Sequence, residues 1–398
     1  MAIGLVLSGG GARGAYEAGV LAELLPWLEE RGERPTTFVG TSVGALGATF
    51  LASVAHLDAG EAAEALVDRW LDVTQERVIR PILTHSSPRT ALRYAAELLG
   101  VPGVRLDGLL DPVPLAATAD AWIDWDAVTR NIEDGTVDAL AIVATSLETE
   151  RATIFVQGRR PDELPTAALV DYVAARVGLD HVLASASIPV IFPAHRVESP
   201  AEVAGWYADG GTRLNTPVKP AVDLGVDRVV VAATHAPFRV REAHRDAVEP
   251  DFAIGALELV QATLIDPLIQ DLRTLGKINE LIPARSARAV GAATGRGYRR
   301  VPYLFAGPSR QGRLGRVVTA VHAEHFAGPV GAARAPDVAF LTRLVGGPGA
   351  AHDELLSYLL FRPEFTRALV DAGRVDARAL LDERDPWRIG PPAPPERG

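Results

Sequence analysis

The sequence contains no cysteine among its 398 residues. Disulfide bonds and thiolate chemistry are therefore both excluded, which fits a protein of a reducing compartment. The first residues also lack the basic region with which a secretory signal peptide begins. No window approaches the roughly 18 consecutive apolar residues that a membrane-spanning helix requires. Together these absences predict a soluble, cytoplasmic protein.

Positive charge is scarce and unevenly placed. The formal net charge is −10, and Lys219 and Lys277 are the only lysines. A negative average field disfavours general binding to nucleic acid or anionic membranes. Between residues 281 and 322, however, there is no acidic residue, and we interpret this segment as a solvated loop face, with a local contact for phosphate head groups as the alternative. Its eight arginines are Arg285, Arg288, Arg296, Arg299, Arg300, Arg310, Arg313 and Arg316.

Strand-like apolar runs alternate with helix-like segments along the chain. Such alternation is typical of βαβ units, so we expect an α/β fold, a three-layer α/β/α arrangement with a mostly parallel central sheet and a helical C-terminal extension. The predicted strands are 2–8, 36–40, two within 139–157, 203–208, 228–235 and one near 301–308. The predicted helices are 13–31, 43–56, 60–74, 251–281 with a break at Pro267, and 352–383.

A glycine-rich loop follows the first predicted strand. Gly9, Gly11 and Gly14 satisfy G-x-G-x-x-G, a pattern that cradles a pyrophosphate in dinucleotide-binding units. Such a unit places an acidic residue at the end of its second strand to bind the ribose, whereas the second strand here ends in "GTS" at 40–42. The sequence therefore disfavours a nicotinamide cofactor and leaves the N–H groups of the loop for another ligand.

The end of the second predicted strand carries a second motif. Gly40, Ser42 and Gly44 form G-x-S-x-G between a strand and a helix, a turn that presents a serine hydroxyl at the helix N-terminus. A serine nucleophile needs a base. An ordinary α/β-hydrolase triad is disfavoured, because the serine comes too early in the chain and no late histidine lies in a strand-end loop. The late histidines are His322, His325 and His352.

A candidate base follows the strand predicted at 203–208. Asp209 precedes Gly210 and Gly211, a combination that is also common in ordinary turns. Three glycine-marked strand ends at one edge of a sheet nevertheless favour a functional site, because α/β folds place their sites there. No His or Cys cluster and no D-x-D-x-D-G loop occurs, so the sequence indicates no metal.

Taken together, these motifs make the sequence resemble the patatin-like phospholipases. The resemblance rests on "GGGARG" at 9–14, "GTSVGA" at 40–45 and "DGG" at 209–211, in that order, and it covers residues 2–235. The stretch "ASASIPVIFPAH" at 184–195 also fits, and we interpret Ser185 and Ser187 within it as lining or capping a buried turn. The glycines that support the motifs are Gly9, Gly14, Gly40, Gly44, Gly210 and Gly211.

The resemblance implies a Ser-Asp dyad in place of a triad, with no histidine and no cofactor. Ser42 is then the nucleophile that accepts the acyl group, and Asp209 takes its proton and later activates water. Gly10 and Gly11 offer backbone N–H groups to the oxyanion, and Arg13 fixes this loop or assists near it. The expected activity is hydrolysis of carboxylic esters of lipids, with transient contact to a membrane surface.

The predicted domain organisation follows from the extent of these motifs. We expect a catalytic domain over 1–310, in which 75–120 form a lid or excursion, then a mainly helical extension over 311–383 and a Pro-rich disordered tail over 384–398. Two alternatives to a hydrolase stay open. One is a protein that keeps the fold but only binds lipid or a partner, and the other is an acyltransferase that uses the same dyad.

Overall fold

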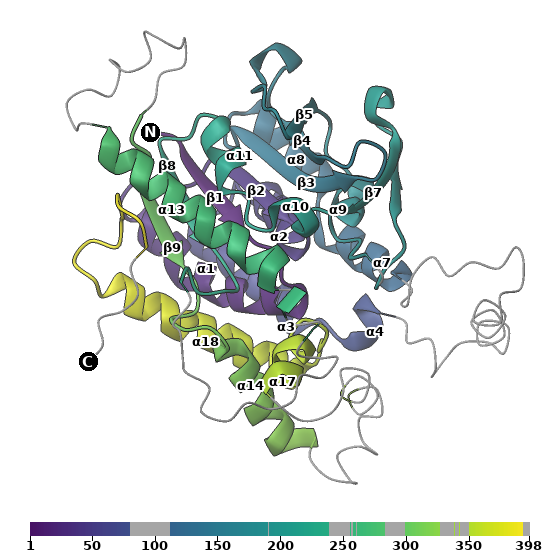
Figure 1. Ribbon diagram of the computed structural model, residues 1–398, viewed down its shortest axis with the longest axis vertical. Helices are drawn as coiled ribbons and strands as arrows, with labels where there is room; N and C mark the ends of the chain where they lie inside the picture. Colours follow the sequence, from purple (N-terminus) through teal and green to yellow (C-terminus); the bar gives the residue numbers. More distant parts are fainter. Residues whose placement is uncertain are drawn as a thin grey trace, which may run out of the picture.

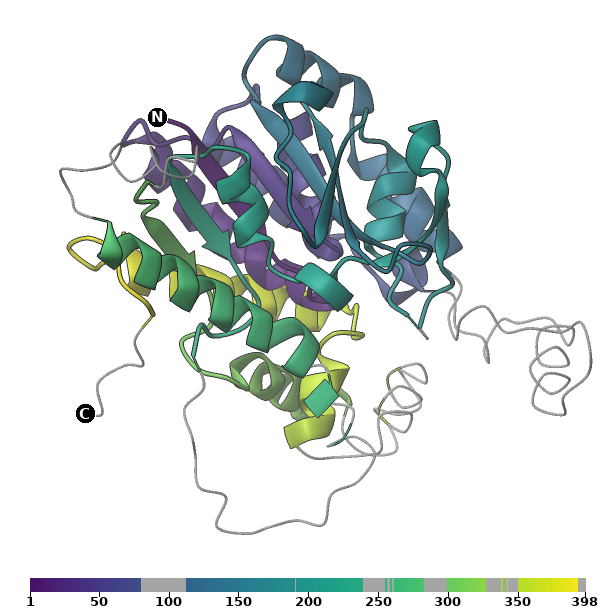
Figure 2. The same cartoon turned by 45° about the horizontal axis from the view of Figure 1, so that its top comes forward.

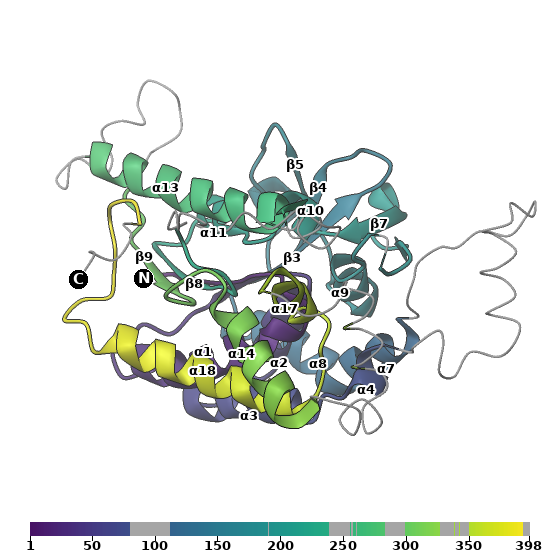
Figure 3. The same ribbon diagram turned by 60° about the horizontal axis from the view of Figure 1, so that its bottom comes forward.

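The computed structural model describes residues 1–79, 112–189, 191–238, 255, 258, 259, 261–282, 299–326, 338, 342 and 350–392. These residues form three layers, in which a sheet lies between two groups of helices (Figure 1 and Figure 3). The predicted α/β/α architecture with a mostly parallel sheet is therefore confirmed.

The central sheet has nine strands, seven of which follow the spatial order β5-β4-β3-β2-β1-β8-β9. The pairs from β3 through β2, β1 and β8 to β9 are parallel, whereas β3 pairs antiparallel with β4 and with β7. The strands are β1 (Ile3–Leu7), β2 (Thr37–Thr41), β3 (Ala139–Ser146), β4 (Ala152–Gln157), β5 (Val170–Ala174), β6 (His195–Val197), β7 (Gly205–Asp209), β8 (Arg228–Ala232) and β9 (Tyr303–Ala306).

The central strands form where the sequence has uninterrupted apolar runs. Every residue of β1, β2 and β3 is buried, because helices cover both faces of the sheet. The carboxyl ends of β1 and β2 and the amino end of α2 (Val43–Ser53) meet at one edge. This edge therefore holds the first two of the three glycine-marked strand ends that the sequence singled out.

Two separate apolar clusters pack against the two faces of the sheet. One face is covered by α1 and its neighbours, and the opposite face by α11 and α13, as Figure 3 shows. The first group comprises α1 (Gly14–Glu29), α2, α3 (Ala59–Leu71), α8 (Trp125–Glu133), α14 (Arg313–Val321), α17 (Ala350–Leu356) and α18 (Pro363–Leu381). The second comprises α11 (Val218–Asp223) and α13 (Asp266–Leu281), with α10 (Gly211–Leu214) beside them.

The C-terminal helix α18 packs directly along α1 (Figure 2). The two helices come close because glycines face each other, so that a Cβ at Gly19 or at Gly373 would overlap backbone of the other helix. Residues 384–392, which belong to the tail predicted at 384–398, make specific contacts with the rest of the protein. Arg388 pairs with Tyr303 of β9, and Trp387 donates its indole N–H to Glu33 at 3.2 Å. The segment has apolar side chains between its prolines, and their burial favours this packing.

Part of the predicted lid region packs against other helices. The helices α4 (Gln75–Val78) and α7 (Val113–Trp122) are described, whereas 80–111 lie outside the described residues. Of the eight arginines, Arg285, Arg288 and Arg296 also lie outside them. Among the others, Arg299 and Arg300 donate to backbone carbonyls, and Arg313 pairs with Asp376. These three guanidinium groups are therefore engaged within the protein.

None of the described helices is long and apolar enough to cross a membrane.

The break predicted at Pro267 is also explained, because α13 starts at Asp266 and places this proline in its first turn, where the missing N–H costs nothing.

The close approach of α1 and α18 gives a stability prediction. Gly373→Leu should lower the free energy of unfolding by about 1–3 kcal/mol or more, because the new side chain must push the two helices apart. Urea denaturation followed by circular dichroism measures the change. The control is Val375→Leu on the same helix, where the side chain is 56% exposed. Equal stability of the two variants would contradict this packing.

Candidate active site

Ser42 occupies a strained turn between β2 and α2. Its backbone has φ 57° and ψ −125°, values that a non-glycine residue rarely adopts. The turn is tight because Gly40 lies against the Gly44 carbonyl, and Gly44 lies against the end of β1, so that a Cβ at either position would overlap backbone atoms. Strain of this kind concentrates at functional sites and persists only where the surroundings enforce it.

The Ser42 backbone is held from the side of α9 (Leu179–Ser185). The Ser42 N–H donates to Ser185 Oγ at 2.8 Å, and this hydroxyl in turn donates to the Val143 carbonyl of β3 at 2.5 Å. Ser185 is fully buried. It therefore joins the strained turn to the sheet, a role beyond the buried-turn residue that the sequence predicted.

Asp209 ends β7 and lies beside the same helix. Its N–H donates to the Ser187 carbonyl at 2.8 Å, and its Oδ1 accepts the Gly211 N–H at 2.6 Å. A Cβ at Gly210 would overlap the Val143 carbonyl, which explains the second position of "DGG". The end of α9 thus positions Ser42 through Ser185, and the turn after α9 positions Asp209 through Ser187.

The Asp209 carboxyl group is buried and incompletely paired. Its Oδ2 accepts no hydrogen bond of ordinary geometry from any described residue. Burial raises the pKa of Asp209 to about 6, although the neighbouring Ser42 hydroxyl and the Gly211 N–H lower this pKa. The structure thus brings Ser42 and Asp209 together and leaves one carboxylate oxygen without a fixed donor.

The glycine loop faces Ser42 from the end of β1. A Cβ at Gly9 would lie 3.2 Å from Ser42 Cβ, and Gly11 has φ 55° and lines the cavity at Ser42. Gly9 N–H donates to the Asn215 carbonyl at 3.0 Å and Ala12 N–H to the Tyr358 carbonyl at 2.9 Å. Gly10 and Gly11 lie between these two residues in the chain, and their N–H groups have no acceptor among the described residues. They are available to a ligand.

Arg13 points away from this loop into the C-terminal region. Its guanidinium group is buried and pairs with Glu354 at 2.7 Å, donates to Ser357 Oγ at 2.7 Å, and lies 3.9 Å from the centre of the Tyr358 ring. These contacts occupy its donors. Direct assistance to an oxyanion stays a prediction, and the contacts favour the other expected role, which is to fix the loop.

His235 is a site residue that the sequence reasoning missed. It follows β8, is buried, and lies 3.2 Å from Arg13 Nη1 and 2.5 Å from the Tyr358 hydroxyl. Desolvation, and secondarily the charge of Arg13, holds its pKa well below the usual range, so the ring is neutral. Its position directly after a central parallel strand was the available signal. Among the described residues, no group of three His, Asp or Glu side chains is placed to hold a metal ion.

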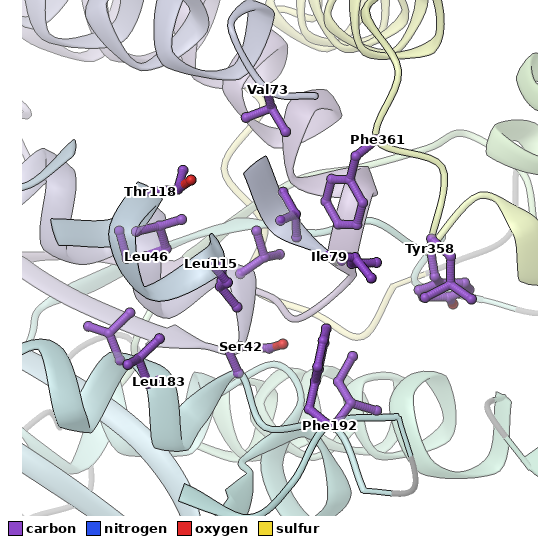
Figure 4. Close-up of a pocket in the computed structure, with 18 of the residues that line it drawn as sticks. Ser42, Leu46, Val73, Ile79, Leu115, Thr118, Leu183, Phe192, Tyr358 and Phe361 are labelled. Atoms are coloured by element: carbon purple, nitrogen blue, oxygen red, sulfur yellow. The ribbon is translucent and has the colours of Figure 1, made fainter. Parts of the chain in front are cut away.

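An apolar cavity of about 690 Å³, open solvent included, lies in front of Ser42. Figure 4 shows the Ser42 hydroxyl directed into it, with Leu115, Ile79 and Phe192 around it. The walls come from α2, α3, α7 and α9, from the end of α4, and from residues 358–361. The lining is almost wholly hydrocarbon, as is common in sites that bind apolar ligands.

The link through Ser185 gives a second stability prediction. Ser185→Ala should lower the free energy of unfolding by about 1–3 kcal/mol, because it leaves the buried Ser42 N–H without its acceptor. The matched control is Ser187→Ala, whose hydroxyl bonds only the Leu183 carbonyl one helical turn away. Urea denaturation of both variants measures the difference. A loss no larger for Ser185→Ala than for Ser187→Ala would contradict the bridging role.

Two solved structures match this chain at low similarity. VipD from Legionella pneumophila is 17% identical, with a TM-score of 0.32, and the match covers 77% of this chain and 61% of VipD. Human GIVD cytosolic phospholipase A2 is 13% identical, with a TM-score of 0.41, covering 96% and 59% of the two chains. The chain therefore spans about three fifths of the length of either protein.

No curated protein sequence gives a significant match. The family model for patatin-like phospholipase matches residues 5–222, a range that contains the glycine loop, the Ser42 turn and Asp209 and exceeds half of the chain. The protein belongs to the patatin-like phospholipase family.

Proposed function

We propose that the protein hydrolyses carboxylic esters of lipids through an acyl-Ser42 intermediate, with Asp209 as the base. The observation that carries the proposal is the juxtaposition of three features at one edge of the sheet. A strained serine faces an apolar cavity, a buried carboxylate lies beside it, and two backbone N–H groups of the glycine loop lack an acceptor.

The first half-reaction transfers the acyl group to the enzyme. Ser42 Oγ attacks the ester carbonyl carbon while its proton passes to Asp209 Oδ2, the oxygen without a fixed donor. Negative charge develops on the carbonyl oxygen, and the N–H groups of Gly10 and Gly11 stabilise it. When the C–O bond of the ester breaks, Asp209 returns the proton to the departing alcohol.

The second half-reaction releases the acid. Asp209 accepts a proton from water as the water oxygen attacks the acyl-serine carbonyl, and the tetrahedral intermediate again lies against the glycine loop. Its collapse returns the proton to Ser42 and frees the fatty acid. A carboxylate with an ordinary pKa is a weak base, so the raised pKa of Asp209 favours both proton transfers.

The cavity selects for a hydrocarbon substituent on the acyl side. Each methylene group that leaves water for such a cavity contributes about 0.8 kcal/mol of binding free energy. Thr118 is the exception in a lining that is otherwise hydrocarbon near Leu46, Leu115 and Phe361. Because residues 358–361 form part of this wall, we also propose that the catalytic unit extends past residue 310 into the C-terminal helices.

Covalent labelling tests the nucleophile. A long-chain alkyl fluorophosphonate should modify the protein once, at Ser42, because the hydroxyl opens into the apolar cavity. Intact-protein mass spectrometry and peptide mapping measure the adduct. Ser42→Ala should abolish both the adduct and ester hydrolysis, whereas the control Ser187→Ala should keep both. Labelling that persists in Ser42→Ala would disprove the assignment.

The pH dependence tests the base. Asp209 accepts a proton only when ionised, and its pKa is raised to about 6. We therefore expect kcat/KM for a neutral ester to be level above this pH and to fall about tenfold per pH unit below it. Stopped-assay rates between pH 4 and 9, at constant ionic strength, give the profile. An inflection near 4, the value of an exposed carboxyl group, would rule out Asp209 as a buried base.

A further inference from the structure

The peptide unit between Gly9 and Gly10 is anchored on one side only. Its carbonyl oxygen accepts two side-chain hydrogen bonds, from Thr234 Oγ1 and from Asn215 Nδ2, each at 3.3 Å. Both donors are buried, Thr234 at 1% exposure and Asn215 at 1%. The N–H of the same peptide unit belongs to Gly10 and has no acceptor among the described residues.

Because the peptide unit is planar, hydrogen bonds that hold the Gly9 carbonyl oxygen also fix the direction of the Gly10 N–H. In a trans peptide the C=O and N–H bonds point to opposite sides, and rotation about the C–N bond is blocked. The Gly9–Gly10 bond is trans. Two donors that hold the Gly9 oxygen therefore aim the Gly10 N–H away from β8 and α10, and a glycine without such an anchor has wide backbone freedom.

Thr234 is itself held by a chain of hydrogen bonds that reaches the C-terminal region. His235 Nδ1 lies 3.1 Å from Thr234 Oγ1, and His235 Nε2 lies 2.5 Å from the Tyr358 hydroxyl. Arg13 Nη1 lies 3.2 Å from the same Nε2.

The direction of this chain follows from the donor inventory. A guanidinium group can only donate, so His235 Nε2 is an acceptor and the neutral ring carries its proton on Nδ1. Tyr358 then donates to His235, His235 donates to Thr234, and the Thr234 hydroxyl proton is left for the Gly9 carbonyl. Each donor in this series of hydrogen bonds therefore has a single acceptor.

We propose that Thr234 and Asn215 are positioning residues that aim the Gly10 N–H at the developing oxyanion, and that the Tyr358–His235 pair orients the Thr234 hydroxyl for this task. The inference rests on the hydrolase mechanism proposed above. It assigns a function to three residues outside the matched family range, Thr234, His235 and Tyr358.

Thr234 also fixes the position of the loop by contact. A Cβ at Gly10 would lie 2.8 Å from Thr234 Oγ1 and 2.9 Å from its Cγ2, so the loop backbone rests directly on this side chain. Thr234→Val keeps the shape and removes the hydroxyl, whereas Thr234→Ser keeps the hydroxyl and removes the methyl group. The pair therefore separates orientation from packing.

The experiment compares these two variants with the unmodified protein in the hydrolysis of a soluble p-nitrophenyl ester. Thr234→Val should lower kcat and kcat/KM equally, by about 10- to 100-fold, because a misdirected donor affects the transition state and not ground-state binding. Thr234→Ser should restore most of the rate. Tyr358→Phe should show a smaller fall in kcat with unchanged KM.

Inhibition by a long-chain alkyl trifluoromethyl ketone supplies the second measurement, because its adduct with Ser42 carries an oxyanion. Thr234→Val should weaken this inhibition by a factor similar to the loss in kcat, while competition by dodecanoic acid, a ground-state ligand of the cavity, should not change. Thermal unfolding of each variant confirms that it is folded.

The outcomes separate the two proposals. If the unmodified protein neither turns over the ester nor forms the ketone adduct, the proposed function fails and this inference fails with it. If the unmodified protein does both, but folded Thr234→Val keeps its kcat and its ketone affinity, the positioning role is wrong while the hydrolase stands. Equal losses in Thr234→Val and Thr234→Ser would assign Thr234 to packing alone and also overturn the inference.

Discussion

The conformation of one residue, Ser42, constrains much of the surrounding architecture. A non-glycine residue at φ 57° carries backbone strain of about 1–3 kcal/mol, which contacts with the neighbouring structure have to offset. The offset comes from three directions: β2 leads into the turn, the end of β1 lies under Gly44, and α9 delivers the Ser185 hydroxyl to the backbone N–H. The segment that contains α9 and β7, in which β7 pairs antiparallel with β3, therefore also helps to hold the Ser42 turn.

The Asp209 carboxyl group shows how stability and chemistry oppose each other in this fold. A buried carboxylate with an unpaired oxygen is costly, and more hydrogen-bond donors would relieve that cost. Those donors would also lower its pKa and make it a poorer base. The protein supplies one firm donor, the Gly211 N–H, and leaves the second oxygen to the serine side. The glycine loop follows the same logic, since it carries N–H groups that the protein itself does not use.

The sequence predicted the sheet and the local motifs well, because both depend on neighbours in the chain. Apolar runs placed β1, β2, β3 and β8, and glycine spacing marked the turn at Ser42 and the turn after Asp209. The contacts of Arg13 could not be predicted in this way, because its partners Glu354 and Tyr358 lie more than 300 residues away. Ser185 and His235 were missed or undervalued for the same reason. A serine in a buried turn and a histidine after a strand acquire their roles only from what the fold places beside them.

The packing of the C-terminal segment against the glycine loop has a consequence for how the proposed site is assembled. The motifs that make up the proposed dyad are complete once Asp209 has left the ribosome, but the partners of Arg13 and one wall of the cavity belong to residues 354–361. The loop and cavity therefore reach their final form only when this late segment docks. Because Glu354 and Tyr358 follow the glycine loop by more than 300 residues, the proposed site is complete only after most of the chain has been synthesised.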